Sequence, residues 1–181
     1  LVGGLVGATV AKTGSFAPVI WSGFGKILLF IVLSPLLGFL LGGLLMVLVA
    51  WLFRNHSPRQ VGKWFNYTQV VASGAYSLTH GGNDAQKTIG IIWLLLISAG
   101  VATTDVKTLP DWVIYSCYFS IAWGTYLGGW RIVKTMGTKI TKLNSVSGSC
   151  ASMSGAISLG IATLAGIPVS TTHTITGSIV G

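Results

Sequence analysis

Several long stretches without a single Asp, Glu, Lys or Arg limit the folds open to this sequence. They comprise residues 27–53, 64–83, 88–104, 113–130 and 143–172. A membrane-spanning helix needs about 20 mostly apolar residues. Only 8% of the residues are charged, whereas an average soluble domain has roughly 25%. These features predict an all-α integral membrane protein, a multi-pass helical bundle of the cell membrane surrounded by the lipid bilayer.

The basic residues indicate how such a bundle is oriented. The net charge of +8 could suggest a nucleic-acid partner, but the Lys and Arg residues are dispersed beside the apolar stretches, so none is expected. Short loops rich in Lys and Arg tend to face the cytoplasm. Two such loops occur, with Arg54, Arg59 and Lys63 in one and Arg131, Lys134, Lys139 and Lys142 in the other. Both are predicted to be cytoplasmic, and residues 101–111 are predicted to lie outside.

The two ends of the sequence resemble each other. The segment LVGGLVG at residues 1–7 aligns without gaps with ITGSIVG at residues 175–181, so that two glycines and a valine coincide. One reading is a chance match of small residues; the other is a pair of inverted repeats that enter the membrane from opposite faces. The second reading makes the chain a fragment of a longer protein. Residues 1–11 then end a first re-entrant hairpin, residues 12–63 form a scaffold spanning helix and a cytoplasmic loop, and residues 64–181 form the second repeat.

The stretch HGGNDAQKTIG at residues 80–90 interrupts an otherwise apolar element. Its paired glycines, Gly81 and Gly82, predict a discontinuous helix whose second half is capped by Asn83 or Asp84. A carboxylate inside a membrane is costly unless it meets a cation, a proton or a buried partner. Asp84 is therefore the first candidate functional residue, although a helix cap between two ordinary spans would also explain the motif.

Two neighbours of this motif bear on its role. Lys87 is three positions after Asp84 and would face the same side of a helix, so a salt bridge alone could explain both charges. His80 is four positions before Asp84 and could relay a proton near neutral pH, or be an ordinary polar residue.

A second interruption lies in AGIPVSTTHTITG at residues 165–177. Pro168 ends one helix, and Ser170, Thr171 and Thr172 supply hydroxyls and free amides at the start of the next. Such a helix start inside a membrane favours an anion, and a re-entrant hairpin is predicted here. Simple capping of the turn is the alternative, and His173 could either donate to the anion or close the turn.

Taken together, these two motifs resemble those of the inorganic phosphate transporter family, also called the Pit family. Each half of its members carries a Gly-Ala-Asn-Asp motif and a Pro-x-Ser-Thr-Thr-His motif, and here GGND at residues 81–84 and PVSTTH at residues 168–173 match in the same order. The segment LVGGLVG is similar to the sequence that follows the Ser-Thr-His of the first half. The resemblance covers essentially the whole chain.

The resemblance implies a secondary active transporter that couples phosphate uptake to a cation gradient. Carried over to this chain, it assigns Ser170, Thr171 and Thr172 to phosphate, and Asn83 and Asp84 to the cation or proton. The DAQKTIG sequence departs from the Asp-Val-Ala-Asn form of sodium-coupled members. It is more similar to bacterial low-affinity members, which use protons and take up metal–phosphate complexes.

Three other functions compete with phosphate transport. Relatives that carry sulfate have similar motifs, and a non-transporting membrane receptor would not need Asp84. An enzyme is not expected, because the sequence shows no activated nucleophile, metal cluster or cofactor loop. Cys117 and Cys150 have no His or second Cys at ligand spacing, so they are predicted to be packing residues and no bound metal or cofactor is expected. Whether the protein forms a homodimer is left open.

Overall fold

The computed structural model describes residues 2–105, 109–135 and 142–181. Leu1 and Lys139, which entered the predictions above, lie outside this set. Within it the chain is all-α, as predicted, with helices α1 Val2–Thr13, α2 Trp21–Leu52, α3 Pro58–Ser98, α4 Asp111–Thr135, α5 Ser145–Leu164 and α6 Thr171–Val180.

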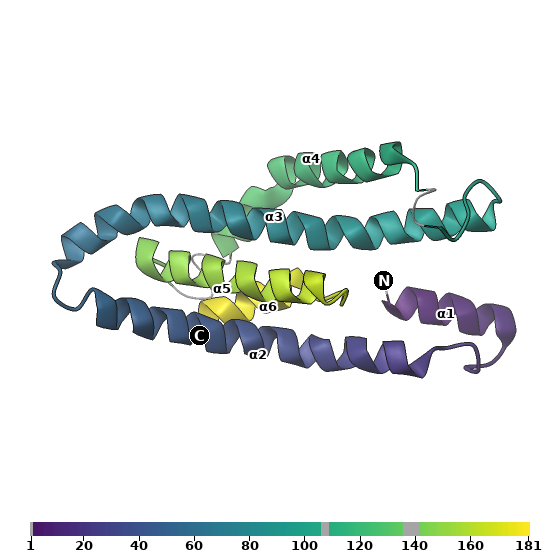
Figure 1. Cartoon of the computed structure of the whole chain (residues 1–181), viewed down its shortest axis with the longest axis horizontal. Helices are drawn as coiled ribbons and strands as arrows, with labels where there is room; N and C mark the ends of the chain where they lie inside the picture. Colours follow the sequence, from purple (N-terminus) through teal and green to yellow (C-terminus); the bar gives the residue numbers. More distant parts are fainter. Residues whose placement is uncertain (1, 106–108, 136–141) are drawn as a thin grey trace.

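The two longest helices, α2 and α3, run antiparallel and enclose a helical hairpin made of α5 and α6 (Figure 1). Ser145 donates to Asn66 over 2.5 Å at one end of the α3–α5 contact, and Asn83 donates to Thr163 over 3.2 Å at the other. The residue numbers rise in the same direction along both helices from the first pair to the second, so α5 runs parallel to α3. The fourth helix, α4, packs along α3.

Glycines set the contact between α2 and α6. A Cβ atom built on Gly177 would overlap the carbonyl oxygen of Pro35, and one built on Gly38 would lie 2.5 Å from the carbonyl oxygen of Thr174. The helices therefore touch backbone to backbone, which only residues without a side chain permit. Gly42 makes the same kind of contact, since a Cβ atom built on it would meet the backbone of Ser178.

The prediction of a discontinuous helix at residues 81–84 is wrong. α3 is one uninterrupted α-helix from Pro58 to Ser98, and residues 81–84 lie inside it. A glycine inside a helix costs only about 1 kcal/mol, and two side-chain contacts at helical spacing, together with one contact to α5, offset this cost. Asp84 pairs with His80 and with Lys87 along the helix, and Asn83 contacts α5. Neither Asn83 nor Asp84 acts as a cap.

The break at Pro168 is present as predicted. α5 ends in a Schellman motif, in which Gly166 adopts φ 66° and the N–H of Ile167 donates to the carbonyl of Ala162 over 3.0 Å. The chain then turns at Pro168, and Ser170 is the N-cap of α6. This turn folds α6 back against α5, so the hairpin itself is confirmed, while its re-entry into a membrane stays a prediction.

The surface of the molecule is apolar. Among the described helices α2 alone is long and apolar enough, by length and composition, to cross a membrane. Large hydrophobic side chains are nevertheless exposed on α3 and α4 as well, including Val70, Leu78, Trp123, Tyr126 and Trp130. Apolar surface on this scale indicates contact with lipid or with further protein. The buried, unbridged thiols of Cys117 and Cys150 fit their predicted packing role.

Candidate functional site

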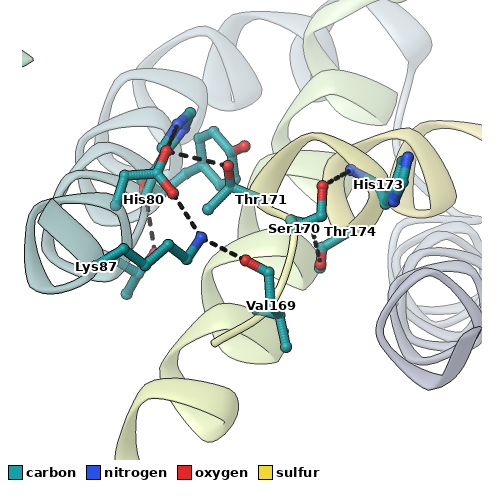
Figure 2. Close-up of polar contacts among 10 residues, drawn as sticks. His80, Lys87, Val169, Ser170, Thr171, His173 and Thr174 are labelled. Atoms are coloured by element: carbon teal, nitrogen blue, oxygen red, sulfur yellow. Dashed lines mark hydrogen bonds and ion pairs between the residues drawn. The ribbon is translucent and has the colours of Figure 1, made fainter. Parts of the chain in front are cut away.

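Asp84 is the centre of a polar cluster that joins α3 to the start of α6. One carboxylate oxygen, Oδ1, accepts from Lys87 Nζ over 2.9 Å. The other, Oδ2, lies 3.1 Å from His80 Nε2 and accepts from Thr171 Oγ1 over 3.3 Å. The two predicted motifs, far apart in the sequence, therefore meet directly, as the close-up in Figure 2 shows.

Lys87 has two partners in this cluster. In addition to its bond to Asp84, its ammonium donates to the carbonyl oxygen of Val169 over 2.6 Å. The carbonyl belongs to the irregular segment between α5 and α6, where a main-chain acceptor has no helical partner. The salt bridge that the sequence left open is thus present, and Lys87 also ties the hairpin to α3 (Figure 2). The bond to Val169 had no signal in the sequence.

Asn83 faces a different neighbour from Asp84. Its side chain is buried against α5, where Nδ2 donates to Thr163 Oγ1 over 3.2 Å. Its Oδ1 atom is buried and has no hydrogen-bond partner in the described part of the chain. The adjacent residues Asn83 and Asp84 therefore do not converge on one point, and Asn83 offers an unused acceptor between α3 and α5.

The polar residues at the start of α6 have different surroundings. Ser170 Oγ accepts from the N–H of His173 over 3.4 Å and caps the helix, whereas the buried Thr171 side chain contacts Asp84. Thr172 and His173 are exposed, and His173 lies on the side of α6 away from Lys87 (Figure 2). Of the hydroxyls predicted to act together, only that of Thr171 joins the cluster.

A cavity of about 820 Å³ opens beside the cluster. Its polar wall contains Asp84, Lys87, Ser170 and Thr171, and its opposite walls come from α1 and α2, including Val6. The N–H groups of the first residues of α6 have no acceptor within the helix, and the helix dipole places partial positive charge there. An anion in this cavity would meet that helix start and the Lys87 ammonium. The apolar walls supplied by α1 and α2 were not predicted.

Comparison with known proteins identifies the protein family of this chain. Residues 53–181 match the sequence model of a family described as the phosphate transporter family. The chain belongs to this family. The resemblance of its two motifs is thereby confirmed, and the family is one of transporters and not of enzymes, as the sequence predicted.

Several bacterial relatives cover the whole chain. A protein of Rhizobium meliloti named "Probable low-affinity inorganic phosphate transporter" is 54% identical over all 181 residues, which span 54% of its length. A Bacillus subtilis protein of the same name is 40% identical, again over the full chain and 54% of its own length. The chain thus spans about half the length of these relatives. No solved structure matches it.

Proposed function

We propose that this chain is part of a cell-membrane, multi-pass transporter that carries inorganic phosphate together with a coupling cation. Family membership supports the class of protein. The observation that carries the proposal is the 3.3 Å hydrogen bond between Thr171 and Asp84. It joins a helix start suited to an oxyanion to the one acidic residue outside residues 105–111, so that binding of an anion and of a cation can influence each other.

Phosphate would bind at the start of α6. The hydroxyls of Ser170 and Thr171 line the cavity there, together with the Lys87 ammonium. Hydrogen bonds to an ionised group are about twice as strong as those between neutral groups. Because the Thr172 side chain is exposed, Thr172 would contribute through its backbone N–H. His173, on the far side of α6, would have no contact with the ligand.

The coupling cation would act at Asp84, and we favour a proton over sodium. Both carboxylate oxygens already have partners in Lys87, His80 and Thr171. A proton needs one oxygen atom and no shell of ligands, whereas sodium would need several free oxygens. The unpartnered Oδ1 of Asn83 is an additional acceptor nearby on α3, although it faces α5. His80, within hydrogen-bond distance of Asp84, is suited to pass the proton on.

Uptake measurements on the full-length protein in proteoliposomes would test this function. We expect labelled phosphate to enter when an inwardly directed proton gradient is imposed, and not when a sodium gradient is imposed alone. Excess sulfate should leave uptake unchanged, and adding Mg²⁺ shows whether a metal–phosphate complex is carried. Equal competition by sulfate would identify a sulfate transporter, and absence of uptake under every gradient would support a receptor.

Replacing both Ser170 and Thr171 by Ala is expected to weaken phosphate transport about 10-fold or more. Each hydroxyl that donates to a charged ligand contributes roughly 1.5–3 kcal/mol, but the single O–H of Thr171 already donates to Asp84 and must leave it to reach the ligand. The concentration of phosphate that gives half-maximal uptake measures the effect. Thr176→Ala is the matched control, because this hydroxyl on α6 donates to the carbonyl of Thr172 and does not line the cavity. If the double variant transports with unchanged apparent affinity, Ser170 only caps α6 and Thr171 only holds Asp84.

A further inference from the structure

A second cavity lies at the opposite end of the hairpin from the phosphate site. It has a volume of about 760 Å³ and opens between the end of α2, the turn at residues 53–57, the start of α3 and the start of α5. The polar and basic residues that line it are His56, Arg59, Lys63, Asn66, Asn144 and Ser145. The apolar residues that line it include Met46, Val49, Ala50 and Phe53. We call this cavity the basic groove.

Aromatic rings hold the groove in shape. The Phe53 ring lies 5.6 Å from the Phe65 ring and 5.9 Å from the Trp64 ring, and the His56 ring lies 5.6 Å from that of Trp64. The two Phe53 contacts are edge-to-face, which is a favourable geometry. Ser145, which also lines the groove, donates to Asn66 and joins α5 to α3. These contacts fix the turn and the start of α5 against the start of α3.

The charge in the groove is positive and uncompensated. Arg59 and Lys63 are four positions apart on α3, so their side chains project from the same face of the helix. Both are exposed, and no carboxylate lies within ion-pair distance of either in the described part of the chain. The three acidic residues of the sequence are Asp84, Asp105 and Asp111, and none of them lines the groove. An anionic partner would satisfy this charge.

The position of the groove relative to the membrane follows from exposed aromatic residues. Trp51, Trp64 and Tyr67 directly follow the lining residues Ala50, Lys63 and Asn66 in the sequence and are 66%, 52% and 80% exposed. Exposed Trp and Tyr collect at the level of the lipid headgroups. The groove is lined in part by the Arg- and Lys-rich segment at residues 54–63, which the positive-inside bias assigns to the cytoplasm. Its basic and its apolar lining residues therefore offer contacts to both the headgroup and the acyl chain of a lipid in the adjoining leaflet.

We propose that the basic groove binds one anionic phospholipid, with its phosphate against Arg59 and Lys63 and the first part of an acyl chain along the α2 side. Free inorganic phosphate could use the two cations but would leave the apolar lining residues uncovered, whereas a lipid would contact both the basic and the apolar residues. This inference rests on the membrane location in the proposed function and not on phosphate transport. Its role would be to stabilise the turn between α2 and α3.

Native mass spectrometry of the full-length protein would test the proposal. The purified protein is exchanged into nanodiscs that contain equal amounts of phosphatidylglycerol and phosphatidylcholine, released, and analysed for retained lipid. We expect one phosphatidylglycerol to be retained in preference to phosphatidylcholine. Replacing both Arg59 and Lys63 by Gln should weaken this retention about 30-fold, the effect of losing two basic groups near an anionic lipid.

The control replaces Arg54 and Lys26 by Gln. This double variant removes the same charge, and neither residue lines the groove; Arg54 instead stacks over the Trp51 ring at 5.8 Å. Its retention of phosphatidylglycerol should equal that of the unmodified protein. Equal retention of both lipids by the unmodified protein overturns the proposal without any variant. Loss of retention in the control, or displacement of the lipid by millimolar inorganic phosphate, overturns it as well.

Discussion

Gradient-driven phosphate uptake is expected to fall at least about 100-fold when Asp84 is replaced by Asn. The variant keeps the size of the side chain but loses the group that would carry the proton, and it leaves Lys87 without its ionic partner. Leaving one charge of a buried pair unpaired can cost about 3–5 kcal/mol, although Asp84 and Lys87 are only partly buried here. Uptake into proteoliposomes under an imposed proton gradient measures the loss.

Two further variants separate coupling from simple ion pairing. Asp84→Glu retains a titratable group and should retain measurable uptake, whereas Asn does not titrate. Combining Asp84→Asn with Lys87→Met removes both charges and should restore part of the thermal stability that the single change lowers, because no charge stays unpaired but the bond from Lys87 to the Val169 carbonyl is lost. If gradient-driven uptake returned together with stability in this double variant, Asp84 would be one half of a structural ion pair and nothing more. Wild-type uptake by Asp84→Asn alone would lead to the same conclusion.

The largest effect on folding is expected from Gly177→Ala. The added methyl group would overlap the carbonyl of Pro35, and both atoms belong to helical backbones that cannot rotate away. Forcing extra volume into such a contact typically costs about 1–3 kcal/mol. We expect the midpoint of thermal unfolding in detergent to fall by several degrees, with α6 detached from α2.

Gly74→Ala is the matched control for this change. Gly74 is also helical, but a Cβ atom there would meet no atom within 4 Å. Because Ala stabilises a helix relative to Gly by up to about 1 kcal/mol, the control should be as stable as the unmodified protein or slightly more so. Equal unfolding midpoints for Gly177→Ala and the unmodified protein would mean that α2 and α6 do not touch in this way.

The sequence was a sound guide where a residue type leaves the backbone little choice. Pro168 disfavours a continuous helix, and α5 ends at Leu164, four residues before it. Gly38 and Gly42 permit a close helix contact, and they make one. Paired glycines such as Gly81 and Gly82 permit a break without requiring it. Contacts of the residues around them, which no local pattern reveals, keep α3 helical.

The candidate site was predictable in its members but not in its arrangement. Asp84 and Thr171 were singled out separately, and their contact across 87 positions depends on how the hairpin packs between α2 and α3. Asn83 and Asp84 were expected to act as a pair, but adjacent positions on a helix point about 100° apart and face different neighbours. The walls that α1 adds to the cavity could not be inferred from local sequence at all.

The number of protons on Lys87 has a consequence for how a ligand can be held. An ammonium group has three N–H donors, and here two are directed at Asp84 and Val169. One donor is left over, so an incoming anion can form a single bond to Lys87 at no expense to the protein. A second bond would have to displace Asp84 or the carbonyl of Val169. Lys87 Nζ therefore cannot bind an anion through two hydrogen bonds and also keep both of its bonds to Asp84 and Val169, which join α3 to the hairpin.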